Sequence, residues 1–164
     1  MTFARLTMMK ALILGLGNEL LGDDAVGILA ARTLKERLKD KADVVESSLS
    51  GMALLDLFIG YERAIIIDAV KTGRTPPGTI YELSPADLGA VLAPSPHYAG
   101  LPELIATAQA LHLDFPKEIK IFALEVEDLY TIGGKLSPAV ARAVGELVQR
   151  VEQALTTPSG TPLL

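Results

Sequence analysis

Two aspartates and one histidine have the residue types needed to bind a divalent metal ion, and they come from three separate segments of the chain. Asp24 follows the glycine-containing segment 15–22, Asp68 ends an apolar run, and His97 lies in a proline-containing loop. Carboxylate and imidazole ligands without sulfur suit nickel, zinc or manganese, and three of them leave coordination positions open. The sequence has no cysteine, which excludes disulfides, thiolate catalysis, zinc fingers and iron–sulfur ligation.

Each candidate residue also has a purely structural interpretation. Asp24 could be an acid favoured in the first turn of a helix by the helix dipole, and Asp23 could have that role or be the N-cap. Asp68 could accept hydrogen bonds from nearby loop amides, although a carboxylate that closes an apolar strand loses solvation unless something compensates. His97 could be an ordinary loop residue. The other histidine, His112, ends a predicted helix and is interpreted as structural or exposed.

The elements that must position these residues alternate between strands and helices. Apolar, β-branched runs predict strands at Lys10–Leu14, Asp43–Glu46, Arg63–Asp68, Thr79–Leu83 and Ile119–Leu124. Helical spacing of apolar residues predicts helices at Asp24–Leu38, Gly51–Ile59, Leu101–Leu111 and Ser137–Leu155. In the second of these helices, Met52, Leu55 and Phe58 are expected to face inward. Ser137 is the expected N-cap of the last helix, with Pro138 as its first residue.

This alternation predicts an α/β fold: a three-layer sandwich with a mostly parallel sheet of about five strands and helices on both faces. The connection 72–78 is short and rich in proline and glycine, so the strand that follows it is expected to be an antiparallel edge strand. Ligands of parallel sheets bind beyond the carboxyl ends of the strands. We therefore expect Asp24, Asp68 and His97 to meet at that edge.

Length and composition limit the remaining possibilities. The 164 residues suit a single domain, expected at 9–155, with an N-terminal extension at 1–8 and a flexible tail at 156–164. A net charge of −5 with few aromatic residues argues against a nucleic-acid partner. No apolar run reaches the roughly 18 residues of a membrane helix, and the run 11–17 fits a buried strand better than a signal peptide. We expect a cytoplasmic monomer without a membrane partner.

The glycine-containing segment also raises the possibility of a dinucleotide-binding loop. That fingerprint requires a third small residue where this chain has Leu20. In addition, Asp23 and Asp24 stand where a pyrophosphate would bind, and two like charges about 4–5 Å apart repel by roughly 1–4 kcal/mol near a protein surface. The segment suits a cation better than a phosphate.

Four motifs in order resemble the endopeptidases that mature nickel–iron hydrogenases, and the resemblance covers Lys10 to about Leu155. The first motif is Gly-x-Gly-Asn, followed by two apolar residues, Asp-Asp and a later glycine. The second is an apolar strand that ends in Asp-Ala and is followed by a Pro-Gly turn. The third is Ser-Pro-His, and the fourth is Leu-Ser-Pro directly before the last helix. In this chain they occupy residues 15–27, Asp68-Ala69 with Pro77-Gly78, Ser95–His97 and Leu136–Pro138.

The resemblance implies an endopeptidase that removes the C-terminal extension of a nickel–iron hydrogenase large-subunit precursor after nickel insertion. Asp24, Asp68 and His97 match the side chains that contact metal in the family, and Asp24 stands where many members have glutamate. The metal is implied to be nickel carried by the substrate, with cadmium or zinc able to occupy the same site. The family is usually grouped with aspartic-type peptidases, which implies that Asp24 and Asp68 are catalytic.

Several alternatives stay open at the level of sequence. Nickel could polarise the scissile carbonyl or activate water with Asp24 or Asp68 as general base, or the three residues could only recognise nickel while the acids act as in aspartic peptidases. The protein could instead be a non-proteolytic nickel-binding escort for hydrogenase assembly, or a small-molecule-binding domain. Segments 46–49 and 125–127 depart from the family pattern, and this bears on which hydrogenase is processed.

Overall fold

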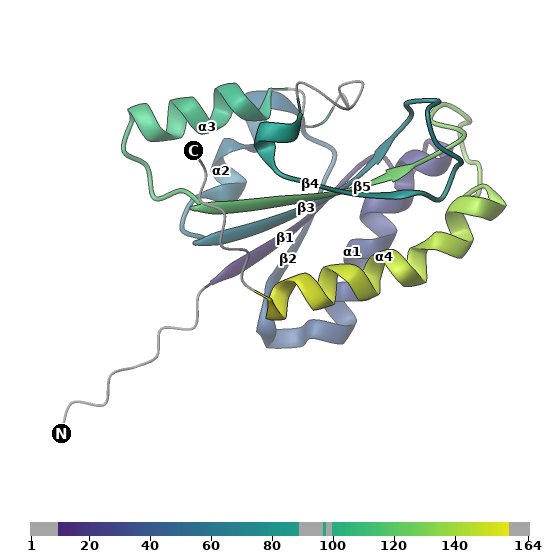
Figure 1. Ribbon diagram of the computed structural model, residues 1–164, viewed down its shortest axis with the longest axis horizontal. Coiled ribbons are helices and arrows are strands. Elements are labelled where there is room, and N and C mark those ends of the chain that lie inside the picture. Colours follow the sequence, from purple (N-terminus) through teal and green to yellow (C-terminus); the bar gives the residue numbers. More distant parts are fainter. Residues whose placement is uncertain (1–9, 89–96, 98–99, 158–164) are drawn as a thin grey trace.

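The computed structural model describes residues 10–88, 97 and 100–157, which form a five-stranded sheet with helices on both faces (Figure 1). The strands lie in the order β2-β1-β3-β5-β4, and only the β4–β5 pair is antiparallel among them. Their bounds are β1 Ala11–Leu16, β2 Asp43–Ser47, β3 Arg63–Val70, β4 Ile80–Leu83 and β5 Glu118–Glu125. The predicted fold class, including the antiparallel edge strand, is confirmed.

The helices form two layers, one on each side of the sheet. The α-helices are α1 Val26–Leu38, α2 Leu55–Phe58, α3 Leu101–Ala110 and α4 Pro138–Thr156. Short 3-10 turns occupy Gly22–Ala25, Lys39–Lys41, Gly51–Leu54 and Pro85–Asp87. α1 and α4 cover one face, and α2 and α3 cover the other (Figure 1). No helix in the described part of the chain is long and apolar enough to span a membrane.

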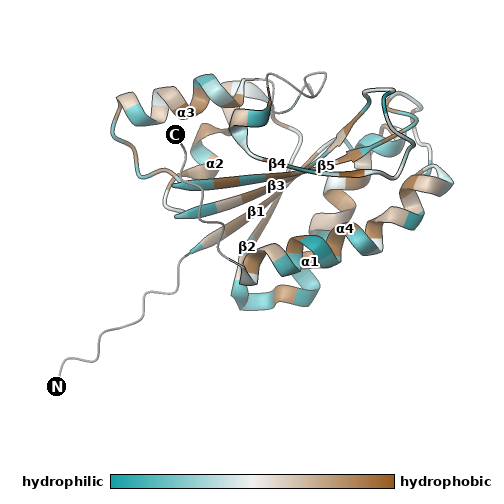
Figure 2. Ribbon diagram, in the orientation of Figure 1, coloured by the Kyte–Doolittle hydropathy of each residue, from teal (hydrophilic) through white to brown (hydrophobic). Residues whose placement is uncertain are grey.

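The core consists of two apolar clusters separated by the sheet. Alternate residues of β3 point to opposite faces, so Ile65 and Ile67 pack beneath α1 and α4, whereas Ile66 packs beneath α2 and α3. Figure 2 shows apolar colour along much of the strands and mixed colour on the covering helices. A sheet covered on both faces explains why its central strands are continuous apolar runs rather than alternating patterns.

Four strands continue further than the sequence predicts, β2 and β5 by one residue and β1 and β3 by two. β1 extends to Leu16 and β3 to Val70, so Asp68 lies inside β3 rather than at its last residue. The β1–β3 pairing ends at Gly15 opposite Ile67, but the β3–β5 pairing continues to Val70 opposite Glu125. The end of β3 is therefore set by β5, and Asp68 emerges just beyond the register of β1.

The structure corrects the predicted helices in three respects. The first and second helices begin with 3-10 turns, so α1 proper starts at Val26. Met52 is exposed rather than facing inward, whereas Phe58 is fully buried. α4 ends at Thr156, one residue inside the predicted tail; the rest of that tail, beyond residue 157, and the predicted extension at 1–8 lie outside the described residues.

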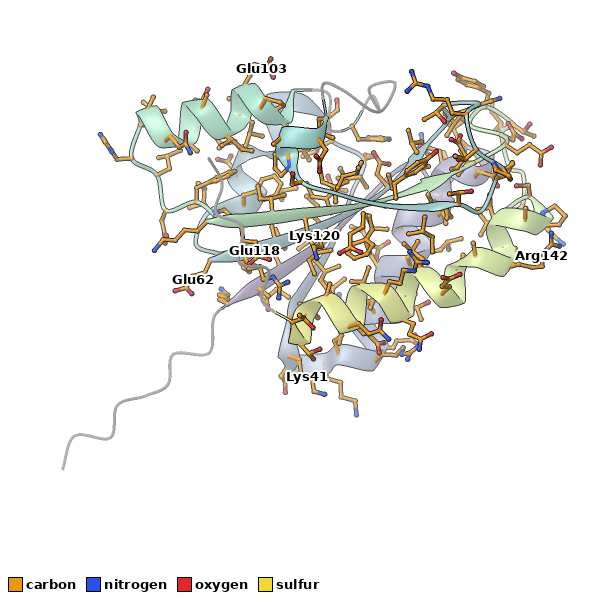
Figure 3. All side chains as sticks on the ribbon, in the orientation of Figure 1. Lys41, Glu62, Glu103, Glu118, Lys120 and Arg142 are labelled. Atoms are coloured by element: carbon orange, nitrogen blue, oxygen red, sulfur yellow. The ribbon has the colours of Figure 1, made fainter. Side chains whose placement is uncertain are left out.

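The edge where β3 and β5 begin is held by a buried arginine. Arg63 contacts Glu118 with Nε at 3.1 Å from Oε1. Its guanidinium also donates to the carbonyls of Ala154, Leu155 and Thr157 at the end of α4. Figure 3 labels Glu118 and Lys120 near the start of β5. This anchor satisfies the terminal carbonyls of α4 and lies at the edge opposite to Asp24 and Asp68.

Candidate metal and active site

Asp24, Asp68 and His97 meet at the carboxyl edge of the parallel strands. One ligand atom from each side chain lies within 4.8 Å of the others. Asp68 is fully buried, and Asp24 and His97 are almost so. His97 Nε2 lies 3.5 Å from Asp24 Oδ2, and its Nδ1 lies 3.4 Å from the carbonyl oxygen of Leu49. We call these three side chains the DDH cluster.

Two glycines allow Asp24 to approach the sheet. Asp24 lies in the 3-10 turn between β1 and α1, and its N–H donates to the carbonyl of Leu21 at 2.9 Å. A Cβ atom on Gly27 would lie 2.1 Å from the carbonyl oxygen of Leu16 and 2.6 Å from that of Ile67. A Cβ atom on Gly17 would lie 2.0 Å from the carbonyl oxygen of Asp24. The start of α1 can therefore contact β1 and β3 only because these positions lack side chains.

Asp68 and His97 reach the cluster from different elements. Asp68 Oδ1 accepts the N–H of Ala69 at 2.8 Å, an amide inside β3 rather than one of the loop amides expected for a purely structural role. His97 is tied to the second helical segment, because its carbonyl accepts the N–H of Gly51 at 3.3 Å. The structure therefore brings together three residues that are far apart in the sequence.

The two carboxylates hold a proton on the imidazole. The pKa of His97 is raised to about 9, chiefly by its hydrogen bond to Asp24 and against the opposing effect of burial. The negative charges of Asp68 and Asp24 and the carbonyl of Leu49 raise this pKa further. At neutral pH the ion-free site therefore carries an imidazolium between two acids, and a divalent cation could replace that positive charge.

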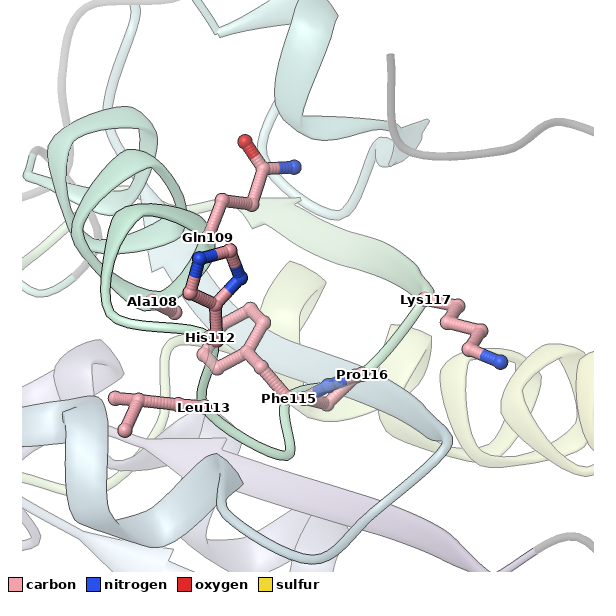
Figure 4. A pocket seen from close by; sticks show the side chains of 7 residues that line it. All are labelled: Ala108, Gln109, His112, Leu113, Phe115, Pro116 and Lys117. Carbon is pink, nitrogen blue, oxygen red and sulfur yellow. The ribbon is translucent and has the colours of Figure 1, made fainter.

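A small cavity adjoins the Asp24 turn. It has a volume of about 320 Å³ and is lined by Gly17, Asn18, Glu19, Leu20, Ile28, Arg32, Glu46, Ser47 and Ser48. Within it, Arg32 binds Glu19 at 2.7 Å and Glu46 at 2.8 Å. A larger cavity of about 570 Å³ lies where α3 leads into β5, and Figure 4 shows His112 and Phe115 in its lining. His112 is exposed, as expected, and this second cavity contains no member of the DDH cluster.

Comparison with known proteins identifies the family. A family model described as hydrogenase maturation protease matches residues 28–154. The chain is also 30% identical over 151 residues to the hydrogenase 2 maturation protease of Escherichia coli K12, a match that covers 90% of this chain and 91% of that protein. The chain belongs to the hydrogenase maturation protease family.

Solved structures of maturation proteases have the same fold. The hydrogenase maturating endopeptidase HybD from Escherichia coli matches with a TM-score of 0.77 and 29% identity, over 90% of this chain and 93% of that one. The [NiFe] hydrogenase maturation protease HybD from Thermococcus kodakarensis matches with a TM-score of 0.70 and 28% identity, over 88% and 98% of the two chains. The resemblance based on four motifs is thus confirmed.

In this maturation protease, Asp23 has a role that the sequence did not predict. It is fully buried and is not an N-cap. Its carboxylate accepts the N–H groups of Glu127, Asp128 and Ser137 at 3.1, 2.9 and 2.7 Å, and the hydroxyl of Ser137 at 2.8 Å. Ser137 occupies the N-cap position of α4, but its side chain binds Asp23 instead of capping the helix. Asp23 therefore ties the β5–α4 connection to the Asp24 turn.

Glu125 is a second buried carboxylate that sequence reasoning did not select. It accepts the N–H of Thr72 at 2.8 Å and hydroxyl hydrogen bonds from Thr72, Thr75 and Tyr81. These contacts order the connection between β3 and β4. The sequence feature that could have identified Glu125 is its position at the end of β5, inside the segment 125–127 that departs from the family pattern.

Proposed function

We propose that this protein is an endopeptidase that removes the C-terminal extension of a nickel–iron hydrogenase large-subunit precursor after nickel insertion. Members of its family cleave the C-terminal extension of the hydrogenase large subunit. The observation that supports this function is the convergence of two buried carboxylates and one imidazole within 4.8 Å, which gives the reaction a candidate site. The substrate, a precursor with its metal centre in place, would present its nickel and its scissile bond to the DDH cluster.

The donor set of the DDH cluster fits a divalent metal ion. It offers carboxylate oxygens and an imidazole nitrogen, which suit nickel and also cadmium or zinc. His97 must lose its proton before it can coordinate, since only the neutral imidazole is a ligand. Three protein donors leave positions for groups that the substrate supplies. We therefore treat nickel as part of the substrate rather than as a resident cofactor.

The proposed hydrolysis is of the aspartic type. A carboxylate of Asp24 or Asp68 would take a proton from the attacking water, whose oxygen bonds to the scissile carbonyl carbon. The same proton would then reach the amide nitrogen as the carbon–nitrogen bond breaks, giving a carboxylic acid and an amine, and the acid then passes its remaining proton to the amine or to solvent. Nickel held by the substrate would anchor the precursor at the DDH cluster and would polarise oxygen atoms close to it.

The variant Asp68→Asn tests this proposal. The substitution is nearly isosteric, so the fold should persist, while cleavage of a nickel-loaded precursor, measured by mass, should fall by about 10²–10⁴-fold. Asp40→Asn, at an exposed position in the turn after α1, is the matched control and should cleave normally. Normal turnover by Asp68→Asn would assign Asp68 a structural role. Binding of the loaded precursor without cleavage by the wild type would instead indicate a nickel-binding escort.

A further inference from the structure

The large apolar side chains that remain exposed are gathered at two places. Among the described residues they are Leu20, Leu49, Met52, Tyr130 and Ile132 near the DDH cluster, and Ile59, Leu111 and Leu113 at the opposite edge of the sheet. Leu20 lies on the segment that carries Asp24, and Leu49 and Met52 lie on the segment that contacts His97. Tyr130 and Ile132 lie on the segment that hydrogen-bonds to Asp23, the neighbour of Asp24 in the chain. Large exposed apolar groups with no use in the fold commonly mark an interaction site.

Three of these side chains stand on a backbone that is firmly held. Leu20, Tyr130 and Ile132 are 63%, 76% and 81% exposed. Leu21 forms a β-bridge with Ile132, and the N–H of Gly133 donates to the carbonyl of Leu20 at 2.8 Å. Their exposure is therefore a property of an ordered surface. We call these three residues the apolar rim.

Two acids fix the apolar rim relative to the DDH cluster. The Asp128 carboxylate accepts the N–H groups of Tyr130 and Thr131 at 2.9 and 3.1 Å. Asp23, next to Asp24 in the chain, binds the N–H of Asp128 itself. The rim is thus connected to the Asp24 turn by a short chain of hydrogen bonds, and it should keep its position when a substrate binds.

The position of the rim identifies its partner. The DDH cluster is buried, so a protein that presents a peptide bond to it must lie over the segments around it. A hydrogenase maturation protease has a hydrogenase large-subunit precursor as its substrate, so the partner is a protein that extends beyond the scissile bond. We propose that the apolar rim binds an apolar surface of that precursor next to its C-terminal extension. This inference rests on the proposed function and assigns Leu20, Tyr130 and Ile132 to substrate docking.

Binding of the nickel-loaded precursor to rim variants tests the inference. Leu20→Ser, Tyr130→Ser and Ile132→Ser should each weaken the Kd by about 5-fold or more, because buried apolar anchors typically dominate such interfaces. Leu111→Ser is the matched control: Leu111 is 62% exposed but lies at the opposite edge, so the Kd should change by less than about 2-fold. Tyr130→Phe keeps the ring and should retain the wild-type Kd.

Two further measurements separate the possible outcomes. Cadmium affinity, which reports on the DDH cluster, should be the same in the rim variants and the wild type. If the wild type cleaves the precursor and the rim variants bind it normally, the rim proposal is wrong and the proposed function stands. If the wild type does not cleave, the proposed function fails. Sedimentation showing that the rim variants only disrupt a dimer of this chain would assign the rim to a second copy and overturn the proposal.

Discussion

His97 has the environment of a proton-binding residue as much as that of a metal ligand. It lies between two carboxylates in a site that is almost fully buried, and its pKa is raised to about 9. A simple loop histidine would not be held from both ring nitrogens, as His97 is by Asp24 and the carbonyl of Leu49. The proton and a divalent ion therefore compete for the same imidazole.

We predict that the affinity of the DDH cluster for cadmium increases with pH. Below about pH 9, His97 must release its proton when the ion binds, so affinity should rise by up to about tenfold per pH unit between about pH 6 and pH 8. Above pH 9 the rise should level off, because the ion-free imidazole is then already neutral. Calorimetry in buffers of different ionisation enthalpy should detect close to one proton released per ion at neutral pH. An affinity that is constant over this range would exclude His97 as a ligand.

At the scale of elements, the site depends on how closely the start of α1 approaches the sheet. Asp24 reaches Asp68 because Gly27 allows the first turn of the helix to lie against the carbonyls of Leu16 and Ile67. Asp23 then attaches the β5–α4 connection to the same turn. The geometry of the DDH cluster is thus a consequence of backbone packing between elements.

We predict that Gly27→Ala destabilises the protein and impairs metal binding together. The added methyl group would overlap two carbonyl oxygens, so the free energy of unfolding should fall by about 1–3 kcal/mol, and displacement of Asp24 should lower cadmium affinity. Gly145→Ala is the control, because Gly145 lies in the exposed face of α4 with open space around its Cα. That variant should gain about 0.5–1 kcal/mol and bind cadmium normally. Urea unfolding and calorimetry measure both quantities; wild-type values for Gly27→Ala would refute this account of the site.

At the scale of the whole molecule, the DDH cluster is better suited to complete the coordination of an ion than to retain one. It has two carboxylates and one imidazole, and the chain has no cysteine to add a thiolate. The ion would also have to displace the His97 proton at neutral pH. These features support the proposal that the substrate brings the ion to the DDH cluster.

We predict that cleavage requires nickel in the precursor and that nickel supplied to the protease alone is insufficient. A precursor purified without nickel should remain uncut at any concentration of the protease, since it lacks the group that anchors it to the DDH cluster. The control is the same precursor after nickel loading, followed by mass spectrometry. Efficient cleavage of the nickel-free precursor in the presence of a chelator would show that metal recognition is not the role of these residues.

The sequence by itself determined the architecture and the members of the candidate site. Continuous apolar runs such as Ala64–Ile67 can be buried only in a sheet covered on both faces, and alternation with helices makes most of that sheet parallel. Parallel strands end at one edge, which predicts that Asp24 and Asp68 lie at the same edge of the sheet. His97 followed from the proline-containing loop and from the family motif around it.

Only the tertiary structure decided which acids hold the fold and which surfaces stay open. Asp23 binds groups more than a hundred residues away in the chain, and a carboxylate accepts any N–H, so no local pattern identifies its partners. The exposure of Met52 and the extension of β3 beyond Asp68 depend on neighbouring elements in the same way. Local sequence encodes periodicity and turn chemistry, whereas burial and hydrogen-bond partners depend on packing between segments that meet only in the folded chain.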